Sequence, residues 1–245
     1  MVTIKTDAQI KLMQEGGRIT AGALKEVLKH VKPGVKTIDL DAIAQAYIKQ
    51  NGGEASFKTV KGYKFATCIN INEGIVHGLP NQRKIKSGDL VKVDLGVFYK
   101  GLHTDLSDTV EVETTNHTRF LQTGKKALEL AIKQCIAGNK VGDISYVIQE
   151  MVESGGYTVS RDLVGHGIGT RLHEDPLVPG HGTRGRGVEL KSGMVLALEV
   201  IYQQGDWEID YESDGWTIIT KDKSLAGLFE HTVAITKGRP IVLTA

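Results

Sequence analysis

Two aspartates interrupt an apolar stretch of the sequence that otherwise has the pattern of a β-hairpin. Asp94 lies within the run LVKVDLGVF, and Asp105 lies on the returning segment GLHTDLSD. A buried carboxylate without a partner is costly, so it must be protonated, paired or bound to a cation. We predict a turn about Tyr99 and Lys100, which makes the two aspartates direct cross-strand neighbours whose like charges repel. Alternatively, one strand is an exposed edge and water solvates both aspartates.

Residues of matching chemical type occur at other places in the chain. His166 lies between glycines in LVGHGIGTRLHEDP, and His173 follows it in the same stretch. Glu199 ends the apolar run GMVLALE, and Glu230 lies in LFEHTVAIT before another apolar segment. Taken singly, each could be a surface histidine or the harmless end of a strand.

Together these residues favour a metal site. Four carboxylates and one imidazole are too many ligands for a single tetrahedral zinc ion. They suit two divalent first-row ions bridged by shared carboxylates. Two-metal sites of this kind serve aminopeptidases, phosphatases and nucleases.

Helical and strand-like patterns alternate along the chain. Apolar residues at helical spacing predict a helix over residues 7–31 with Asp7 as its N-cap, and a second helix from a Thr37 cap to residues 51–53. Strands are predicted as far as residue 112. Two more helices are predicted over residues 114–136 and 143–154, and strands occupy the remainder.

The two halves of the chain repeat each other. The sequence NGG at 51–53 is echoed by SGG at 154–156, and KSGDLVKVD at 86–94 is echoed by KSGMVLALE at 191–199. This second alignment sets Glu199 on the position of Asp94. We therefore predict one α+β domain over residues 1–245, in which pseudo-twofold, duplicated helix-helix-strand units surround a central antiparallel sheet.

Composition argues against several other classes of protein. The 245 residues are 40% hydrophobic and 24% charged, as in ordinary globular proteins, and the formal net charge of +1 argues against nucleic-acid binding driven by overall charge. We expect no membrane span and no signal peptide, because the apolar runs are short. The two cysteines form no evident disulfide framework, which favours a reducing, cytoplasmic location. The sequence contains no Walker A loop and no nucleophile elbow.

In combination the motifs resemble type I methionine aminopeptidase over nearly the whole chain. The matching stretches are NEGIVHGLP, VDLGVFYKGLHTD, GHGIGTRLHEDP, GMVLALE and DGWTIITKDKSLAGLFEHT. The resemblance implies a pita-bread fold, which agrees with the internal repeat. It also implies removal of the N-terminal methionine from nascent polypeptides and peptides, with a preference for a small second residue. The reaction would be dinuclear metal-activated water attack on the first peptide bond.

The resemblance further implies roles for individual residues. The ligands of two divalent ions per chain (Co, Mn, Fe, Zn or Ni) would be Asp94, Asp105, His166, Glu199 and Glu230. Glu199 would also be the general base, His173 would stabilise the tetrahedral intermediate, and His77 would contact the scissile amide or the leaving nitrogen. The substrate would bind among His77, Tyr63, Cys68, Leu172, His173 and Trp216.

Two positions depart from the family pattern. Val200 follows Glu199 where the family usually has proline, and Val60 stands where an aromatic residue is common. We expect a monomer that acts on nascent peptide N-termini at the ribosome, with no membrane partner and no direct nucleic-acid site. The alternatives are a proline-specific peptidase of the same fold and a non-catalytic paralogue, although such paralogues usually lose metal ligands.

Overall fold

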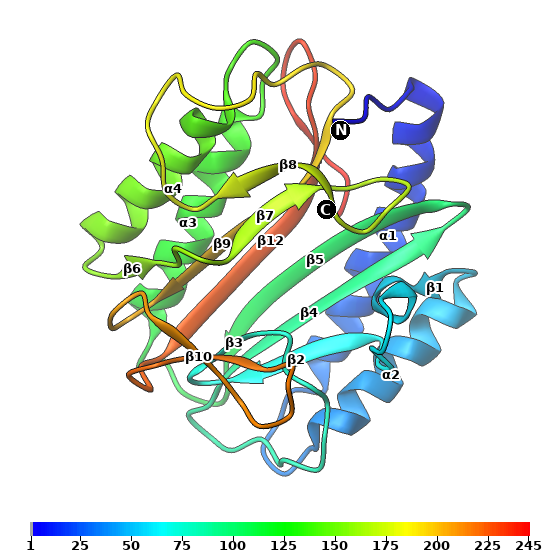
Figure 1. Cartoon of the computed structure of the whole chain (residues 1–245). Coiled ribbons are helices and arrows are strands. Elements are labelled where there is room, and N and C mark those ends of the chain that lie inside the picture. The colour runs from blue at the N-terminus through cyan, green and yellow to red at the C-terminus, as the bar shows by residue number, and fades with distance from the viewer. Residues whose placement is uncertain (1) are drawn as a thin grey trace.

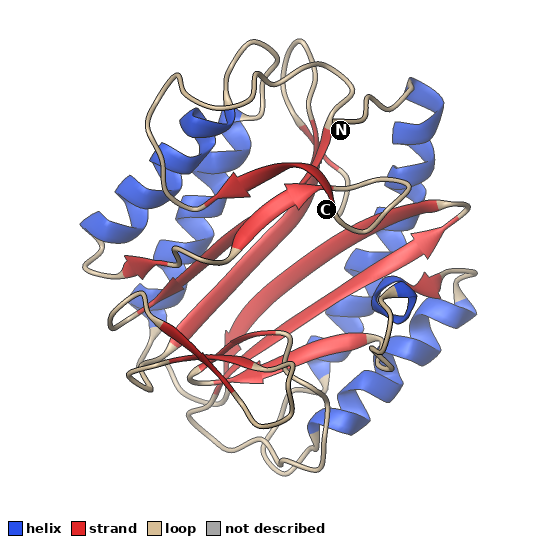
Figure 2. Ribbon diagram, viewed as in Figure 1, coloured by secondary structure: helices blue, strands red, loops and turns tan. Residues whose placement is uncertain are grey.

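Two helix pairs lie behind the two halves of an antiparallel sheet in the computed structural model of the chain, which describes residues 2–245 (Figures 1 and 2). The first half comprises α1 (Asp7–Lys29), α2 (Thr37–Gln50), β1 (Glu54–Ala55), a 3-10 helix (Ser56–Thr59), β2 (Thr67–Ile71), β3 (Gly74–Val76), β4 (Leu90–Tyr99) and β5 (Leu102–Glu111). The second half comprises α3 (Thr118–Gln134), α4 (Val141–Ser154), β6 (Thr158–Val159), β7 (Val164–Gly167), β8 (Glu174–Pro179), β9 (Val195–Gln203), β10 (Ile209–Tyr211), β11 (Ile218–Thr220), β12 (Ala226–Ala234) and β13 (Ile241–Val242).

The sheet confirms the predicted duplication. Its main path runs β1-β4-β5-β12-β9-β7-β8, with β2 added to β4, β6 to β9 and β13 to β12. The long hairpin of β4 and β5 in the first half therefore corresponds to β9 and β12 in the second half, and the halves meet where β5 pairs with β12. A smaller sheet of β10, β11 and β3 lies at one end of the open face.

The N-caps of the first two helices differ from those predicted. Thr6, not Asp7, is the N-cap of α1: its hydroxyl accepts a hydrogen bond from the Gln9 backbone N–H, and the Gln9 side chain accepts one from the Thr6 N–H. Thr37 is the first residue of α2 rather than its cap, because its hydroxyl donates instead to the Asn81 carbonyl. None of the helices in residues 2–245 is long and apolar enough to cross a membrane.

The β4–β5 hairpin has a different register from the one predicted. Tyr99 pairs with Leu102, so the turn residues are Lys100 and Gly101. Both have positive φ (48° and 86°), which is the conformation of a tight two-residue hairpin turn and is easy for glycine at its second position. Asp94 consequently faces Ser107, whereas Asp105 faces Gly96. The two aspartates are diagonal neighbours on one face rather than directly opposed.

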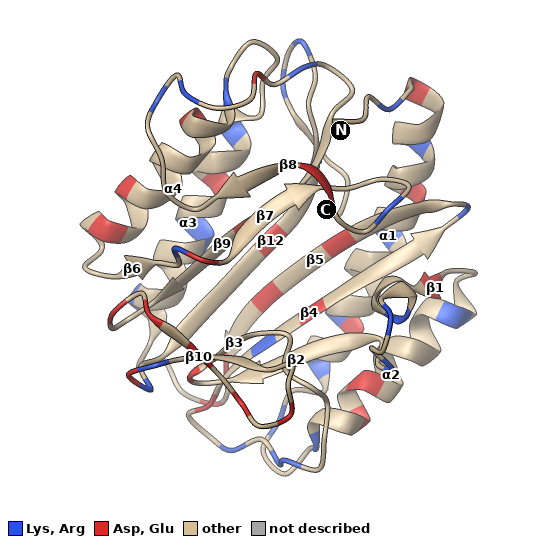
Figure 3. Cartoon of the chain, in the orientation of Figure 1, with Lys and Arg blue, Asp and Glu red and all other residues tan. Residues whose placement is uncertain are grey.

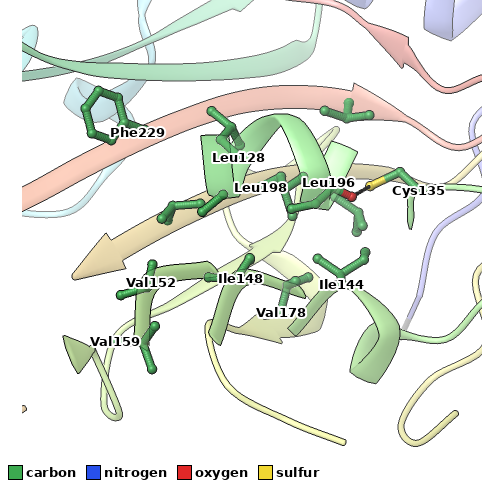
Figure 4. Close-up of a cluster of buried hydrophobic side chains, with 14 of the residues drawn as sticks. Leu128, Cys135, Ile144, Ile148, Val152, Val159, Val178, Leu196, Leu198 and Phe229 are labelled. Carbon is green, nitrogen blue, oxygen red and sulfur yellow. Dashed lines mark hydrogen bonds between the residues drawn. The ribbon is translucent and has the colours of Figure 1, made fainter. Parts of the chain in front are cut away.

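Each helix pair covers its half of the sheet with a separate apolar core. In the second half, α3 and α4 pack on β9 and β12 through a cluster that includes Leu128, Ile148, Leu198 and Phe229 (Figure 4). The corresponding cluster in the first half joins α1 and α2 to β4 and includes Leu24, Leu40 and Val93. The helices therefore bury one face of the sheet and leave the opposite face to carry polar residues.

Helix α1 approaches the C-terminal segment so closely that it tolerates only glycine at one position. A Cβ atom on Gly17 would lie 2.0 Å from the Leu243 carbonyl oxygen, whereas one on Gly16 would meet nothing nearer than 3.2 Å. We expect Gly17→Ala to lower the free energy of unfolding by about 1–3 kcal/mol through overpacking, despite the higher helix propensity of alanine. Urea unfolding measures the loss. Gly16→Ala is the matched control and should change stability by less than about 1 kcal/mol; equal effects of the two would contradict this packing.

Candidate metal centre and substrate cavity

The five predicted metal ligands project from one face of the sheet, around the junction of its halves. A row of paired residues crosses the sheet from Asp94 on β4 to Ser107 on β5, Glu230 on β12 and Glu199 on β9. Directly paired residues share a face, as do residues two apart on a strand. Asp105 on β5 therefore joins this face, and so does His166 on β7, which pairs with Ala197. Figure 3 shows the acidic positions gathered in the middle of these strands.

Three of the five ligands already lie close enough to share an ion. Ligand atoms of Asp105, His166 and Glu230 are all within 4.8 Å of one another, and the three side chains are buried. The Nε2 atom of His166 lies 3.6 Å from the Glu199 Oε1 atom. His166 Nδ1 lies 2.9 Å from its neighbour's carbonyl oxygen, that of Gly167. If Nδ1 carries the proton and donates it there, the lone pair of Nε2 points toward the carboxylates.

Burial of these groups changes their pKa values in a consistent direction. Burial, followed by the charge of Asp105, raises the pKa of the Asp94 carboxyl well above its ordinary range. The same two causes raise the pKa of Glu199 and Glu230, and burial raises that of Asp105 to about 7. Burial, with a smaller contribution from His173, lowers the pKa of His166 to about 4. The fold thus holds four acids where ionisation is unfavourable, beside a histidine kept neutral.

Two orphaned oxygen atoms show that this set fits divalent cations. Asp94 Oδ1 and Glu230 Oε1 are buried and have no hydrogen-bond partner among residues 2–245. Buried polar atoms are nearly always satisfied, so such exceptions call for a missing partner. Carboxylate oxygens with one imidazole nitrogen are a donor set suited to Mn, Fe, Co, Ni or Zn. The alternative that water solvates the aspartates on an exposed edge is wrong, because β4 and β5 both lie inside the sheet.

His173 lies on a loop that is held in place by an ion pair between Glu174 and Lys5. The rings of His166 and His173 contact edge to face, with centroids 4.5 Å apart. The next residue, Glu174, is buried, and its Oε2 atom lies 2.7 Å from the Nζ atom of Lys5 in the N-terminal segment. Its Oε1 atom accepts a hydrogen bond from the Arg171 backbone N–H. These bonds fix the loop that points the exposed His173 imidazole into the site.

His77 lines the same cavity and directly follows β3. Its backbone has a φ of 60°, which is uncommon for a residue other than glycine and is often found at functional positions. Desolvation by the cavity walls lowers the pKa of His77, and the charge of His173 lowers it further. The side chain is exposed, so a neutral imidazole is available to a ligand.

The cavity continues into an aromatic pocket next to the carboxylates. The ring of Tyr63 packs edge-on against Trp216 and Phe57, at centroid distances of 5.1 and 6.3 Å. Tyr63 also donates a hydrogen bond to the Thr67 carbonyl, and its hydroxyl lies 3.1 Å from Cys68 Sγ. The buried Asp41 of α2 holds this segment by accepting bonds from the backbone N–H groups of residues 66 and 67. The pocket is therefore preformed by contacts with the first helix pair.

One cavity of about 370 Å³ contains every residue predicted for the site. Around it lie His77, Tyr63, Cys68, Asp94, Asp105, His166, Leu172, His173, Glu199, Trp216 and Glu230. The structure thus brings all of them together, and their individual roles remain predictions.

The cavity also has walls that the motifs did not assign. Phe57 and Val60 line the aromatic pocket, and Asp162, Leu163, Val164, Leu177, Val76 and Ile201 line the remainder. For Phe57 and Val60, the departure from the family pattern at Val60 is a sequence signal that this segment lies near the pocket. The other residues are apolar ones common in any core and one aspartate without a motif around it, so only the tertiary structure reveals them.

Comparisons with known proteins agree with this geometry. The chain is 39% identical to "Methionine aminopeptidase" of Clostridium acetobutylicum over 247 aligned positions, which cover 100% of this chain and 99% of the relative. A solved structure of methionine aminopeptidase from Thermotoga maritima has a TM-score of 0.96 and 42% identity, covering 100% of this chain and 99% of that one. Prolidase from Pyrococcus furiosus has a TM-score of 0.80 at 24% identity, with 99% of this chain and 65% of that one covered; that likeness concerns the fold alone.

The predicted pita-bread fold is confirmed by these structural neighbours. Residues 11–237 match the family described as "Metallopeptidase family M24". That match includes all five residues of the candidate metal centre, from both halves of the duplicated sheet, and the chain belongs to this metallopeptidase family.

Proposed function

We propose that this metallopeptidase removes the N-terminal methionine from peptides and nascent polypeptides. The observation that carries the proposal is a single cavity with two unlike ends. One end holds the unsatisfied carboxylates and His166, and the other is an apolar pocket around Tyr63 and Trp216. The relatives named methionine aminopeptidase cover the whole chain, which supports the same substrate.

The carboxylate end is suited to two divalent ions. Asp94, Asp105, His166, Glu199 and Glu230 would hold them, and bridging carboxylates would explain why four acids share one site. Ions bound there would supply Lewis acidity and a water acidic enough to react at neutral pH. Metal identity is left open among Co, Mn, Fe, Zn and Ni, because oxygen and imidazole donors suit all of these ions.

The protein's own side chains would then bind the substrate and transfer protons. The raised pKa of Glu199 suits a general base that accepts a proton and later returns it. His173 and His77 both line the cavity, where their N–H groups could donate to the carbonyl oxygen and contact the scissile amide. The thioether of methionine is apolar and polarisable, which suits the lining by Tyr63, Cys68, Leu172 and Trp216.

The finer features of the proposal rest on the family resemblance. They are a preference for a small second residue, action on nascent chains at the ribosome, a monomeric state and a cytoplasmic location.

Metal removal and peptide specificity test the proposal together. We expect chelation to abolish hydrolysis of Met-Ala-Ser and one of the five metals to restore it, because the water needs a cation to become nucleophilic. A panel of Met-X-Ser peptides and an Ala-Pro dipeptide, assayed with each metal by release of the free amino acid, measures specificity. Full activity without metal would refute the mechanism, and faster cleavage of Ala-Pro would favour a proline-specific peptidase.

Substitution of a ligand tests the assignment of the metal centre. Asp105→Asn should reduce kcat/KM for Met-Ala-Ser by at least about 100-fold, because even residues behind metal ligands are worth 10- to 100-fold. Circular dichroism should show an unchanged fold. Asp108→Asn is the matched control on the same strand: this aspartate lies on the other face, where it pairs with Lys125 at 3.5 Å. The assignment is wrong if the two variants retain similar activity.

The raised pKa of Asp105 predicts a pH-dependent difference in stability. In the metal-free fold this carboxyl keeps its proton up to about pH 7, whereas the unfolded chain releases it near pH 4. The native state then binds more protons between these values, so ionisation destabilises the fold as the pH rises. Metal-free Asp105→Asn should therefore become progressively more stable than the native chain from about pH 4 to 7, by urea unfolding. Asp94, Glu199 and Glu230 lose the Asp105 charge that raises their pKa values, which changes the difference in the same direction. A constant or falling difference would contradict the shift.

A further inference from the structure

A fully buried lysine lies on the same face of the sheet as the candidate metal centre. Lys92 is two residues before Asp94 on β4 and has no solvent-exposed surface. Its Nζ atom donates to two backbone carbonyl oxygens, those of Asn72 at 2.7 Å and Ala226 at 3.0 Å. Charged or neutral, the amine has enough hydrogens for both carbonyls.

The two carbonyls belong to segments that lead to other site residues. Ala226 is the first residue of β12, and Glu230, four residues further along the strand, lies on the same face. Asn72 forms the turn between β2 and β3, and His77 follows β3 directly. Lys92 therefore connects the strand of Asp94 to the strand of Glu230 and to the segment of His77.

This connection bridges a gap in the backbone pairing. The ladder between β5 and β12 contains only two pairs, Glu230 with Ser107 and His231 with Leu106. Beyond it, side chains replace the backbone: the Thr109 hydroxyl donates to the Leu228 carbonyl at 2.7 Å and accepts from its N–H at 3.0 Å. Lys92 pairs with Thr109 on the same face and reaches further, to the beginning of β12.

The turn at Asn72 is held by hydrogen bonds of its own, in addition to the one from Lys92. Asn72 has a φ of 53°, and its side-chain oxygen accepts from the Leu90 backbone N–H at 2.9 Å. Its carbonyl accepts from the Ala226 N–H as well as from Lys92. Without the amine, both carbonyls would lose a buried donor, and the beginning of β12 would keep only its indirect link to β4 through Asn72.

We propose that Lys92 is a positioning residue that holds the strands of Asp94 and Glu230 and the segment of His77 in the register needed for metal binding. This inference rests on the proposed function, because it assigns the link a role toward the metal ions. A merely structural lysine would affect the stability of the fold and leave the metal affinity of the folded protein unchanged.

Titration of metal-free protein with Co²⁺, followed by its visible absorption bands, separates these roles. Lys92→Met keeps most of the side-chain volume and removes the donors. We expect its Co²⁺ dissociation constant to rise about 10- to 100-fold, as for other groups that orient metal ligands, with altered absorption bands. Tyr202→Phe is the matched control, because it also removes a buried donor to a carbonyl (that of Phe120, at 2.6 Å) but lies on the helix side of β9. Its Co²⁺ affinity should stay within about threefold of the native value.

The outcomes distinguish this inference from the proposed function. Folded Lys92→Met that binds Co²⁺ as tightly as the native chain overturns the inference alone. A native chain that binds no Co²⁺ overturns the proposed function and the inference with it.

Hydrogen exchange of the native chain supplies a second measurement, which holds even if Lys92→Met fails to fold. Coupling between two sites is reciprocal, so Zn²⁺ binding should slow exchange of the Ala226 amide, which donates to the Asn72 carbonyl, by about tenfold or more. The Gly34 amide, which donates to Ile85, should be unaffected. An unchanged Ala226 rate in metal-saturated protein overturns the inference.

Discussion

Mutual repulsion among four carboxylates in a buried seam is the constraint on which the rest of this structure depends. Charges are costly to remove from water, and like charges in a low-dielectric site raise that cost. Burial raises the pKa of all four carboxyls, and the charge of Asp105 raises those of Asp94, Glu199 and Glu230 further. Divalent cations would turn the same arrangement from unfavourable to favourable. The framework must therefore hold the acids in place against this cost.

The duplicated framework meets this requirement by placing the site between two separately packed halves. Each half has its own helix pair and apolar core behind two long strands. Asp94 and Asp105 come from the first half, and His166, Glu199 and Glu230 from the second, so neither half contains the site alone. The β5–β12 ladder, where the halves meet, contains few backbone hydrogen bonds. Hydroxyl groups extend it, and on one side of Glu230 the Thr109 hydroxyl donates to the Leu228 carbonyl. On the other side, the Thr232 hydroxyl donates to the Asp105 carbonyl and accepts from its N–H. Polar side chains thus replace part of the sheet ladder where the acids must lie.

The sequence was sufficient to predict the acids and the repeat, but not the details that depend on tertiary contacts. An acidic residue inside an apolar run is a signal because burial makes it costly, although a solvated edge strand explains it equally well. The echo of Asp94 by Glu199 is a second, independent signal. The hairpin register was missed by two residues because the turn geometry favours Lys100-Gly101. Thr37 was mistaken for a cap because its partner, Asn81, is distant in sequence. Strand alternation places Lys92 on the face of Asp94, but it does not show that the amine is buried, because one of its two acceptors, the Ala226 carbonyl, is distant in sequence.

The structure gives the two departures from the family pattern very different meanings. Val200 pairs with Phe229 and lies in the apolar core beneath the helices, on the face of β9 opposite to Glu199. A valine there changes core packing and leaves the cavity untouched. Val60 instead lines the aromatic pocket, and the Tyr63 backbone N–H donates to its carbonyl at 3.1 Å. Its side chain is smaller than an aromatic ring, so this wall leaves more room beside Tyr63. Since one methylene group in such a pocket is worth about 1–3 kcal/mol of discrimination, any change in the choice of the first residue is expected from Val60 rather than from Val200.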